Sequence, residues 1–196
     1  MAVRTERRKQ KILHVLRHRQ PTLAVVLENI HDPHNVSAIL RTCDAVGVPV
    51  VHLVYHSGQE FPKLGKKSAA GALKWVERRW HRSIEECYAA LRSEGKKIFA
   101  SVLGPESVDL FTLDLTQPIA LVFGNEHTGV SEEAWKAADG MFQIPQVGMV
   151  QSLNVSVACA VTLYEAFRQR RAAGLYQQPQ YTSAELQQLY EQWLEK

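Results

Sequence analysis

The chain has 196 residues, of which 45% are apolar and 22% charged, and its formal net charge at pH 7 is +3. These values exclude disordered and collagen-like proteins and fit one globular domain with a sizeable core. No apolar run approaches the roughly 20 residues of a membrane span, and the charged N-terminus lacks the apolar region of a secretory signal, so we expect a cytoplasmic protein without membrane association.

Positive charge is concentrated at the start of the chain. Residues 1–20 contain seven Lys or Arg and one acidic residue, Glu6, whereas the rest of the chain has 16 basic and 19 acidic residues. Such a basic segment is typical of proteins that bind a polyanion, although a solvated, partly disordered leader has the same composition. The apolar positions Ile12, Leu13, Val15 and Leu16 favour a helix that docks one face.

Apolar runs and helical patterns alternate after this segment. In chain order they predict a strand over 23–27, a helix over 36–46 ending at Gly47, a strand over 50–54, a Gly/Lys/Ser-rich loop over 57–71 and a strand over 75–80. A helix over 83–95, strands over 98–102 and 119–123, a short helix capped by Ser131 and a strand over 141–144 follow. A long helix over 153–173 precedes a C-terminal helix opened by a capping box at Thr182. This alternation predicts an α/β fold with a mostly parallel sheet covered by helices on both faces.

The three cysteines, Cys43, Cys87 and Cys159, are odd in number and far apart in the chain. They fit neither a disulfide framework nor the local spacing of a metal cluster, so the sequence predicts a reducing compartment and no metal site.

Three strand exits are unusually polar, at 29–35, 124–129 and 145–154. Ligands bind at the carboxyl ends of parallel strands, so these segments predict the binding site. In the third exit, Gln151, Ser152 and Asn154 cluster where the long helix begins. A helix N-terminus offers unpaired N–H groups and a positive dipole end, so ligand binding and ordinary capping explain these side chains about equally well.

The three exits resemble, in the same order, the three motifs of the SPOUT class of RNA methyltransferases, in its TrmH (SpoU) family. The motifs are NIHDPHNVSAILRTCDAVG at 29–47, LVFGNEHTGVS at 121–131 and IPQVGMVQSLNVSVA at 144–158. The resemblance spans about residues 23–171, and three long motifs in order are far more specific than one glycine motif. The basic leader and the C-terminal helix are also similar to those of tRNA-modifying members of the family.

The resemblance implies a SPOUT fold, in which the C-terminal part of the α/β domain forms a deep trefoil knot that binds S-adenosylmethionine. It implies a homodimer in which the first motif of one protomer completes the site of the other.

We expect a basic helical extension over 1–20, the methyltransferase domain over 21–174 and a helical extension over 175–196. The implied reaction is 2'-O-methylation of a tRNA ribose, with guanosine 18 in the D-loop as the first choice. Another RNA (rRNA or a tRNA wobble nucleotide) and a non-catalytic RNA-binding module of the same fold are the alternatives.

The resemblance also implies the roles of individual residues, and the catalytic set is Arg41, Asn35, Glu126, Ser152 and Asn154. A guanidinium is effectively always protonated, so we expect Arg41 to gather an RNA phosphate and stabilise the forming alkoxide, and the proton acceptor stays open. The alternative for Arg41 is an ion pair with Asp44 along the helix, and the alternative for Asn35 is helix capping.

The cofactor-binding residues implied by the resemblance are Ser101, Gly124, Ile144 and Leu153. Core packing is an alternative for the last two. The implied RNA-binding residues are Arg8, Lys11, Arg19, His34, Arg168 and Arg170, because phosphate contacts from cations position an RNA substrate. Arg168 and Arg170 lie near the end of the long helix, where a cation also stabilises the helix dipole.

Overall fold

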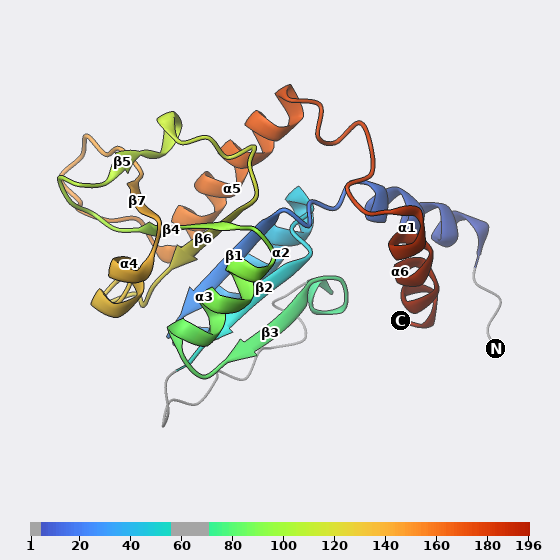
Figure 1. The fold of residues 1–196 in the computed structure, drawn as a ribbon, viewed down its shortest axis with the longest axis horizontal. Helices are drawn as coiled ribbons and strands as arrows, with labels where there is room; N and C mark the ends of the chain where they lie inside the picture. Colours follow the sequence, from blue (N-terminus) through green and yellow to red (C-terminus); the bar gives the residue numbers. More distant parts are fainter. Residues whose placement is uncertain (1–4, 56–70) are drawn as a thin grey trace.

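A seven-stranded sheet forms the centre of the molecule (Figure 1). The computed structural model describes residues 5–55 and 71–196. The strand order is β3-β2-β1-β6-β4-β7-β5, and neighbouring strands pair in parallel. The strands are β1 (Leu23–Glu28), β2 (Val50–Val54), β3 (Glu77–His81), β4 (Lys97–Ser101), β5 (Val108–Asp109), β6 (Ile119–Phe123) and β7 (Gly140–Gln143). The predicted parallel sheet is confirmed.

Helices cover both faces of the sheet, as the sequence predicts. Helices α2 (Pro33–Val46) and α5 (Val155–Ala172) pack on one face, and α3 (Ile84–Ser93) and α4 (Glu132–Ala137) pack on the other. The central strands β1 and β6 are buried at every position, which explains why they are apolar throughout instead of alternating. Among the described residues, no helix is both long and apolar enough to cross a bilayer.

Several predicted boundaries shift for local reasons. Helix α2 begins at Pro33, three residues before the predicted start, because the Asp32 side chain caps it by accepting a hydrogen bond from the His34 N–H at 2.8 Å. The chain runs through the 3-10 turn η1 (Ala72–Lys74) before β3 begins. Strand β5 and the 3-10 turn η2 (Leu110–Thr112) are too short for a periodic pattern to predict. The loop predicted over 57–71 lies almost entirely outside the described residues.

Helices α1 (Glu6–Arg17) and α6 (Ser183–Glu195) lie side by side at one end of the molecule (Figure 1). Ile12 and Leu16 of α1 share a separate apolar cluster with Trp193 of α6. The Trp193 ring lies 4.8 Å from the ring of Trp75, so this pair of helices also contacts the main body. The prediction that the basic helix docks an apolar face is confirmed.

Arg19 follows α1, and its side chain is 1% exposed. Its guanidinium donates hydrogen bonds to Asp44 Oδ1 at 2.5 Å and to the carbonyl oxygens of Val48 and Trp75 at 3.2 and 3.1 Å. The prediction that Arg19 contacts RNA is therefore wrong, because its donors are directed inward. The same bond shows that Asp44 pairs with Arg19, so the alternative role of Arg41 as the partner of Asp44 is also wrong.

Arg170 in α5 is fully buried, and the prediction that it contacts RNA is wrong for the same reason. Its guanidinium donates to the carbonyl oxygens of Leu115 and Gln117 and to the Thr22 hydroxyl, each at 2.8 Å. Burial lowers the pKa of Arg170 to about 10, so the side chain remains a cation at neutral pH. Arg170 thus links α5 to the segments that precede β1 and β6.

We expect Arg170→Met to lower the free energy of unfolding by about 3 kcal/mol, because buried carbonyl oxygens would lose their donor. Urea denaturation followed by circular dichroism measures the change. Arg171→Met is the matched control, since Arg171 is the exposed next residue of the helix and surface changes of this kind stay within about 0.5 kcal/mol. Equal losses in the two variants would contradict the structural role of Arg170.

Candidate active site

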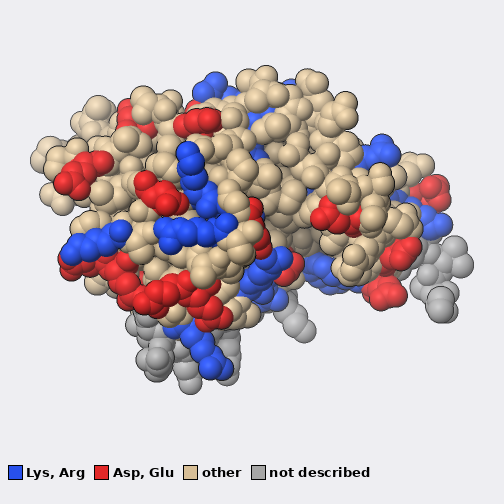
Figure 2. Space-filling model, in the orientation of Figure 1, with Lys and Arg blue, Asp and Glu red and all other residues tan. Residues whose placement is uncertain are grey.

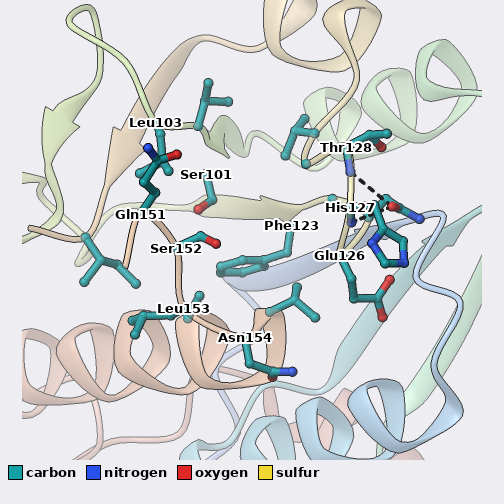
Figure 3. Close-up of a pocket in the computed structure, with 18 of the residues that line it drawn as sticks. Ser101, Leu103, Phe123, Glu126, His127, Thr128, Gln151, Ser152, Leu153 and Asn154 are labelled. Carbon is teal, nitrogen blue, oxygen red and sulfur yellow. Dashed lines mark hydrogen bonds between the residues drawn. The ribbon is translucent and has the colours of Figure 1, made fainter. Parts of the chain in front are cut away.

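A cavity of about 560 Å³ lies at the carboxyl ends of β4, β6 and β7, where the chain enters α5. Its walls come from residues 101–103 and 123–130 and from residues 144, 146, 151–155 and 158. Figure 3 shows Ser101 at the end of β4, Ser152 in the segment before α5 and the ring of Phe123, all of which line the cavity. Volumes of this size are usual for sites that enclose a small molecule. The second and third polar strand exits therefore build a single site.

All four predicted cofactor-binding residues, Ser101, Gly124, Ile144 and Leu153, line this cavity. At Gly124 a side chain has no room, because a Cβ atom would lie 2.1 Å from the carbonyl oxygen of Gly129. The loop after β6 folds back on itself here, with the Gly129 N–H donating to the Asn125 carbonyl at 2.9 Å. The missing side chain thus lets this loop close against the strand end and form the cavity wall.

Three of the predicted catalytic residues form one hydrogen-bonded chain. The Asn154 amide donates to Asn35 Oδ1 at 3.1 Å, and the Asn35 amide donates to Glu126 Oε1 at 3.0 Å. This chain connects the first turn of α2, the loop after β6 and the N-terminus of α5. Asn35 is buried within α2 and Asp32 caps that helix, so Asn35 is not the N-cap. Ser152 lines the same cavity as Glu126 and Asn154.

Glu126 is held as a carboxylate by the donors around it. Burial by itself would raise the pKa of Glu126, but hydrogen bonds from the Asn35 amide and from backbone N–H groups, including those of His31 and Asp32, lower it below the ordinary value. The two backbone bonds are each 3.3 Å long. Glu126 is therefore ionised at neutral pH and fixes the segment that leads into α2.

Asn154 has a second role, because it is the N-cap of α5. Its Oδ1 accepts hydrogen bonds from the Ser156 N–H at 2.9 Å and from the Ser156 hydroxyl at 2.6 Å. Helix capping and membership of this hydrogen-bonded chain therefore occur together in one side chain. The helix begins at Val155, two residues later than the predicted start at Leu153.

Arg41 is the one predicted catalytic residue that neither lines the cavity nor is hydrogen-bonded through its side chain to a residue that lines it. It is exposed, and no residue of α2 lines the cavity. Arg41 lies six residues beyond Asn35 in α2, which places the two side chains about 120° apart around the helix. Within the described part of the chain, the Arg41 side chain forms no hydrogen bond or ion pair. The described chain thus brings Glu126, Ser152 and Asn154 to the cavity and joins Asn35 to two of them by hydrogen bonds, but it does not bring Arg41 there.

Four predicted RNA-binding side chains remain outside the core. Lys11 and His34 are exposed, and the half-buried Arg8 has its guanidinium carbon 6.0 Å from the centre of the Trp75 ring. Arg168 is 67% exposed and pairs with Glu165 at 2.7 Å. On the face of the molecule seen in Figure 2, basic and acidic side chains both occur, and acidic side chains gather over the region of α3 and α4. An RNA backbone would avoid that acidic region.

Two residues that sequence reasoning missed support the loops of the site. The Asn125 amide donates to the Asn29 carbonyl at 2.8 Å and so links the exits of β6 and β1. Glu28, which is 1% exposed, accepts hydrogen bonds from the Ser131 N–H and hydroxyl at 2.9 and 2.5 Å. The sequence did contain a signal for Glu28, which is an acidic residue at the end of an otherwise apolar strand. A carboxylate buried there needs hydrogen-bond donors, so its position predicts a polar partner.

Comparison with known proteins identifies the family. Residues 22–164 match the SpoU rRNA Methylase family. A tRNA (guanosine(18)-2'-O)-methyltransferase of Thermus thermophilus is 49% identical over 196 residues, covering all of both chains. A crystal structure of the A. aeolicus TrmH/SpoU tRNA modifying enzyme superposes with a TM-score of 0.90 at 39% identity, covering 96% of this chain and 95% of that one. An AdoMet-bound rRNA methyltransferase from Sinorhizobium meliloti gives a TM-score of 0.68 at 29% identity, over 80% and 59% of the two chains. The family match covers most of the sequence, and the chain therefore belongs to the SpoU methylase family.

Proposed function

We propose that this protein is an S-adenosylmethionine-dependent methyltransferase that modifies the ribose 2'-hydroxyl of guanosine 18 in tRNA. The observation that carries the proposal is the cavity in which the family's second and third motifs meet, with Asn35 of the first motif hydrogen-bonded to Glu126 and Asn154. The choice of substrate is supported by the T. thermophilus relative, whose name states this activity and which matches the whole chain.

The cavity residues fit the proposed cofactor. Leu103, Phe123, Ile144 and Leu153 supply apolar surface for a flat base, and Ser101 and the exposed Ser152 supply hydroxyl groups. Gly124 leaves backbone groups at the wall, where they can read polar edges of a ligand. When bound, S-adenosylmethionine supplies a methyl group activated by its sulfonium.

The residues of this chain would hold the reactants and stabilise charge. A ribose hydroxyl is a poor nucleophile until its proton leaves or its developing charge is stabilised, and its oxygen must be held in line with the methyl carbon. The network of Asn35, Glu126 and Asn154 fixes the segments on which this alignment depends. Arg41 would gather an RNA phosphate and stabilise the forming alkoxide.

We also propose that Arg41 reaches the cavity of a partner subunit in a homodimer. Two observations support this arrangement. Arg41 lies away from the cavity of its own chain, and α5, which borders the cavity, exposes Val157 and Tyr164 at 47% and 54%. Apolar side chains exposed on a helix next to a site are suited to a subunit contact.

The chain divides into one domain and two helical extensions. We propose a methyltransferase domain over 21–174 with a C-terminal trefoil knot, and helical extensions over 1–20 and 175–196. The separate apolar cluster of α1 and α6 supports this division.

The proposed tRNA contacts are Arg8, Lys11, His34 and Arg168. A tRNA substrate implies a cytoplasmic reaction.

The test is nucleotide mapping of methylated RNA after the protein is incubated with bulk tRNA and labelled S-adenosylmethionine. We expect label in tRNA only, as a 2'-O-methyl group at guanosine 18. A transcript with 2'-deoxyguanosine at that position is the matched control and should take up no label. Methylation of rRNA fragments or of a wobble nucleotide would overturn the substrate, and RNA binding without any methylation would overturn the activity.

A further inference from the structure

Three side chains of kinds that bind metals lie close together between the edge of the sheet and α3, away from the active-site cavity. They are His52 of β2, His81 at the end of β3 and Cys87 of α3, and one ligand atom from each lies within 4.8 Å of the others. His52 and Cys87 are fully buried, and the His81 side chain is 8% exposed. Strand β2 pairs with β3 so that Val54 is opposite His81, which brings the two histidines onto the same face of neighbouring strands.

The hydrogen bonds of the histidine pair are incomplete. His52 Nδ1 lies 3.0 Å from His81 Nε2, so the two rings share one hydrogen bond. The other two ring nitrogens, His52 Nε2 and His81 Nδ1, are buried and have no hydrogen-bond partner within the described residues. These two nitrogens lie on the far sides of the rings, so the two nitrogens that face each other are the ones that could bind a common ligand.

We propose that His52, His81 and Cys87 bind one divalent zinc-type metal ion. Imidazole nitrogen and thiolate sulfur are the ligands that Zn²⁺ prefers, in a tetrahedral arrangement. The facing ring nitrogens are 3.0 Å apart, close to the roughly 3.3 Å that separates two nitrogens in a tetrahedral zinc site. Binding replaces the thiol proton of Cys87, which leaves to solvent, and each imidazole stays neutral with its N–H on the nitrogen that faces away from the ion.

Glu86 completes the arrangement. Its Oε1 lies 3.9 Å from His81 Nδ1, on the side of the ring away from His52. A histidine that binds a metal usually donates its other N–H to a carboxylate, and Glu86 is placed for that role. Charged side chains of both signs act on the two histidines: Glu86 and Glu94 favour a cation there, whereas Arg79 and Lys96 oppose it. A water molecule would fill the fourth position.

The metal would act on stability and not on methyl transfer. None of the three ligands lines the active-site cavity. The ligands come from β2, β3 and α3, so an ion would tie the helix to the two strands at this edge of the sheet. Sequence spacing could not reveal the site, because the three residues come from three separate elements.

The experiment uses the full chain, treated with a chelator, kept reduced and titrated with Co²⁺ and then Zn²⁺. We expect one equivalent of Co²⁺ to produce a thiolate-to-cobalt charge-transfer absorption, and Zn²⁺ to displace it. At a zinc concentration about 100 times Kd, the melting temperature should rise by roughly 5–10 °C.

Cys87→Ser should lose the charge-transfer band and bind zinc at least about tenfold more weakly. Cys159→Ser, a buried free cysteine outside the cluster, is the matched control and should keep both responses.

Absence of stoichiometric metal uptake by the wild-type protein would overturn the proposal, as would an unchanged charge-transfer band in Cys87→Ser. Circular dichroism checks that each variant folds. If Cys87→Ser does not fold, His81→Gln replaces it, because His81 lies in an edge strand and is only partly buried. We expect His81→Gln to weaken zinc binding at least about tenfold, and wild-type affinity in that variant would also overturn the proposal.

Discussion

Replacing Arg41 with alanine should lower the rate of methyl transfer by about 100- to 1,000-fold and leave cofactor affinity within about twofold of the wild-type value. The first effect is expected because the variant loses the cation proposed to stabilise the forming alkoxide. The second is expected because no residue of α2 lines the cavity. Single-turnover rates with labelled S-adenosylmethionine and calorimetric titration of the cofactor measure the two quantities separately.

Arg41→Lys is the matched control for charge. A lysine keeps the positive charge but lacks the planar fork of donors, so its rate should lie between those of the wild type and the alanine variant. Wild-type turnover in Arg41→Ala would show that the catalytic assignment is wrong.

A mixture of two inactive variants tests whether Arg41 acts across the subunit interface. Arg41→Ala keeps its cavity, and Gly124→Val loses its cavity but keeps Arg41. In a mixed dimer of these chains one site would contain both an intact cavity and an intact Arg41, so random pairing should restore about a quarter of wild-type activity. No restoration after co-expression, with mixed dimers verified by mass spectrometry, would place Arg41 and the cavity in the same protomer.

Gly124→Ala should weaken S-adenosylmethionine binding by about 100-fold and lower the free energy of unfolding by about 1–3 kcal/mol. The added Cβ would lie 2.1 Å from the carbonyl oxygen and 2.2 Å from the carbonyl carbon of Gly129. These are backbone atoms, so the whole loop after β6 would have to move away from the strand end. Equilibrium dialysis with labelled cofactor and urea denaturation measure the two effects.

Gly104→Ala is the matched control for Gly124→Ala. Gly104 also follows a strand that ends at the cavity, but a Cβ there meets no atom within 4 Å. This variant should bind the cofactor and unfold as the wild type does. Normal cofactor binding by Gly124→Ala would mean that the loop after β6 does not form the wall of the cofactor site.

The sequence predicts most of the fold because its strands are buried on both faces. Strands β1 and β6 are continuous apolar runs, and the capping residues Ser83 and Thr182 mark helix starts that the structure confirms. Boundaries fail where a cap lies outside the apolar pattern. Asp32 is the example, since it starts α2 one turn earlier than the apolar residues indicate.

The sequence is less informative about which charged residues reach solvent. Arg19 and Arg170 lie in basic segments, but their acceptors, such as Asp44 and Leu115, are distant in the chain and come together only in the folded protein. Composition gives the charge of a segment and no information on the direction of a guanidinium. Most cavity residues were predictable because the second and third motifs carry them, whereas Asn125 acts through a contact with another strand exit that no local pattern indicates.

The contact between α1 and α6 has a consequence for how the protein is made. Ile12 and Leu16 are synthesised long before their partner Trp193. A domain can begin to fold while the nascent chain is still growing, yet α1 must wait until almost 180 further residues have been added. The paired helices can therefore form only on a chain that has been translated at least as far as Trp193, so a prematurely terminated product would lack this end of the molecule even if its sheet had folded.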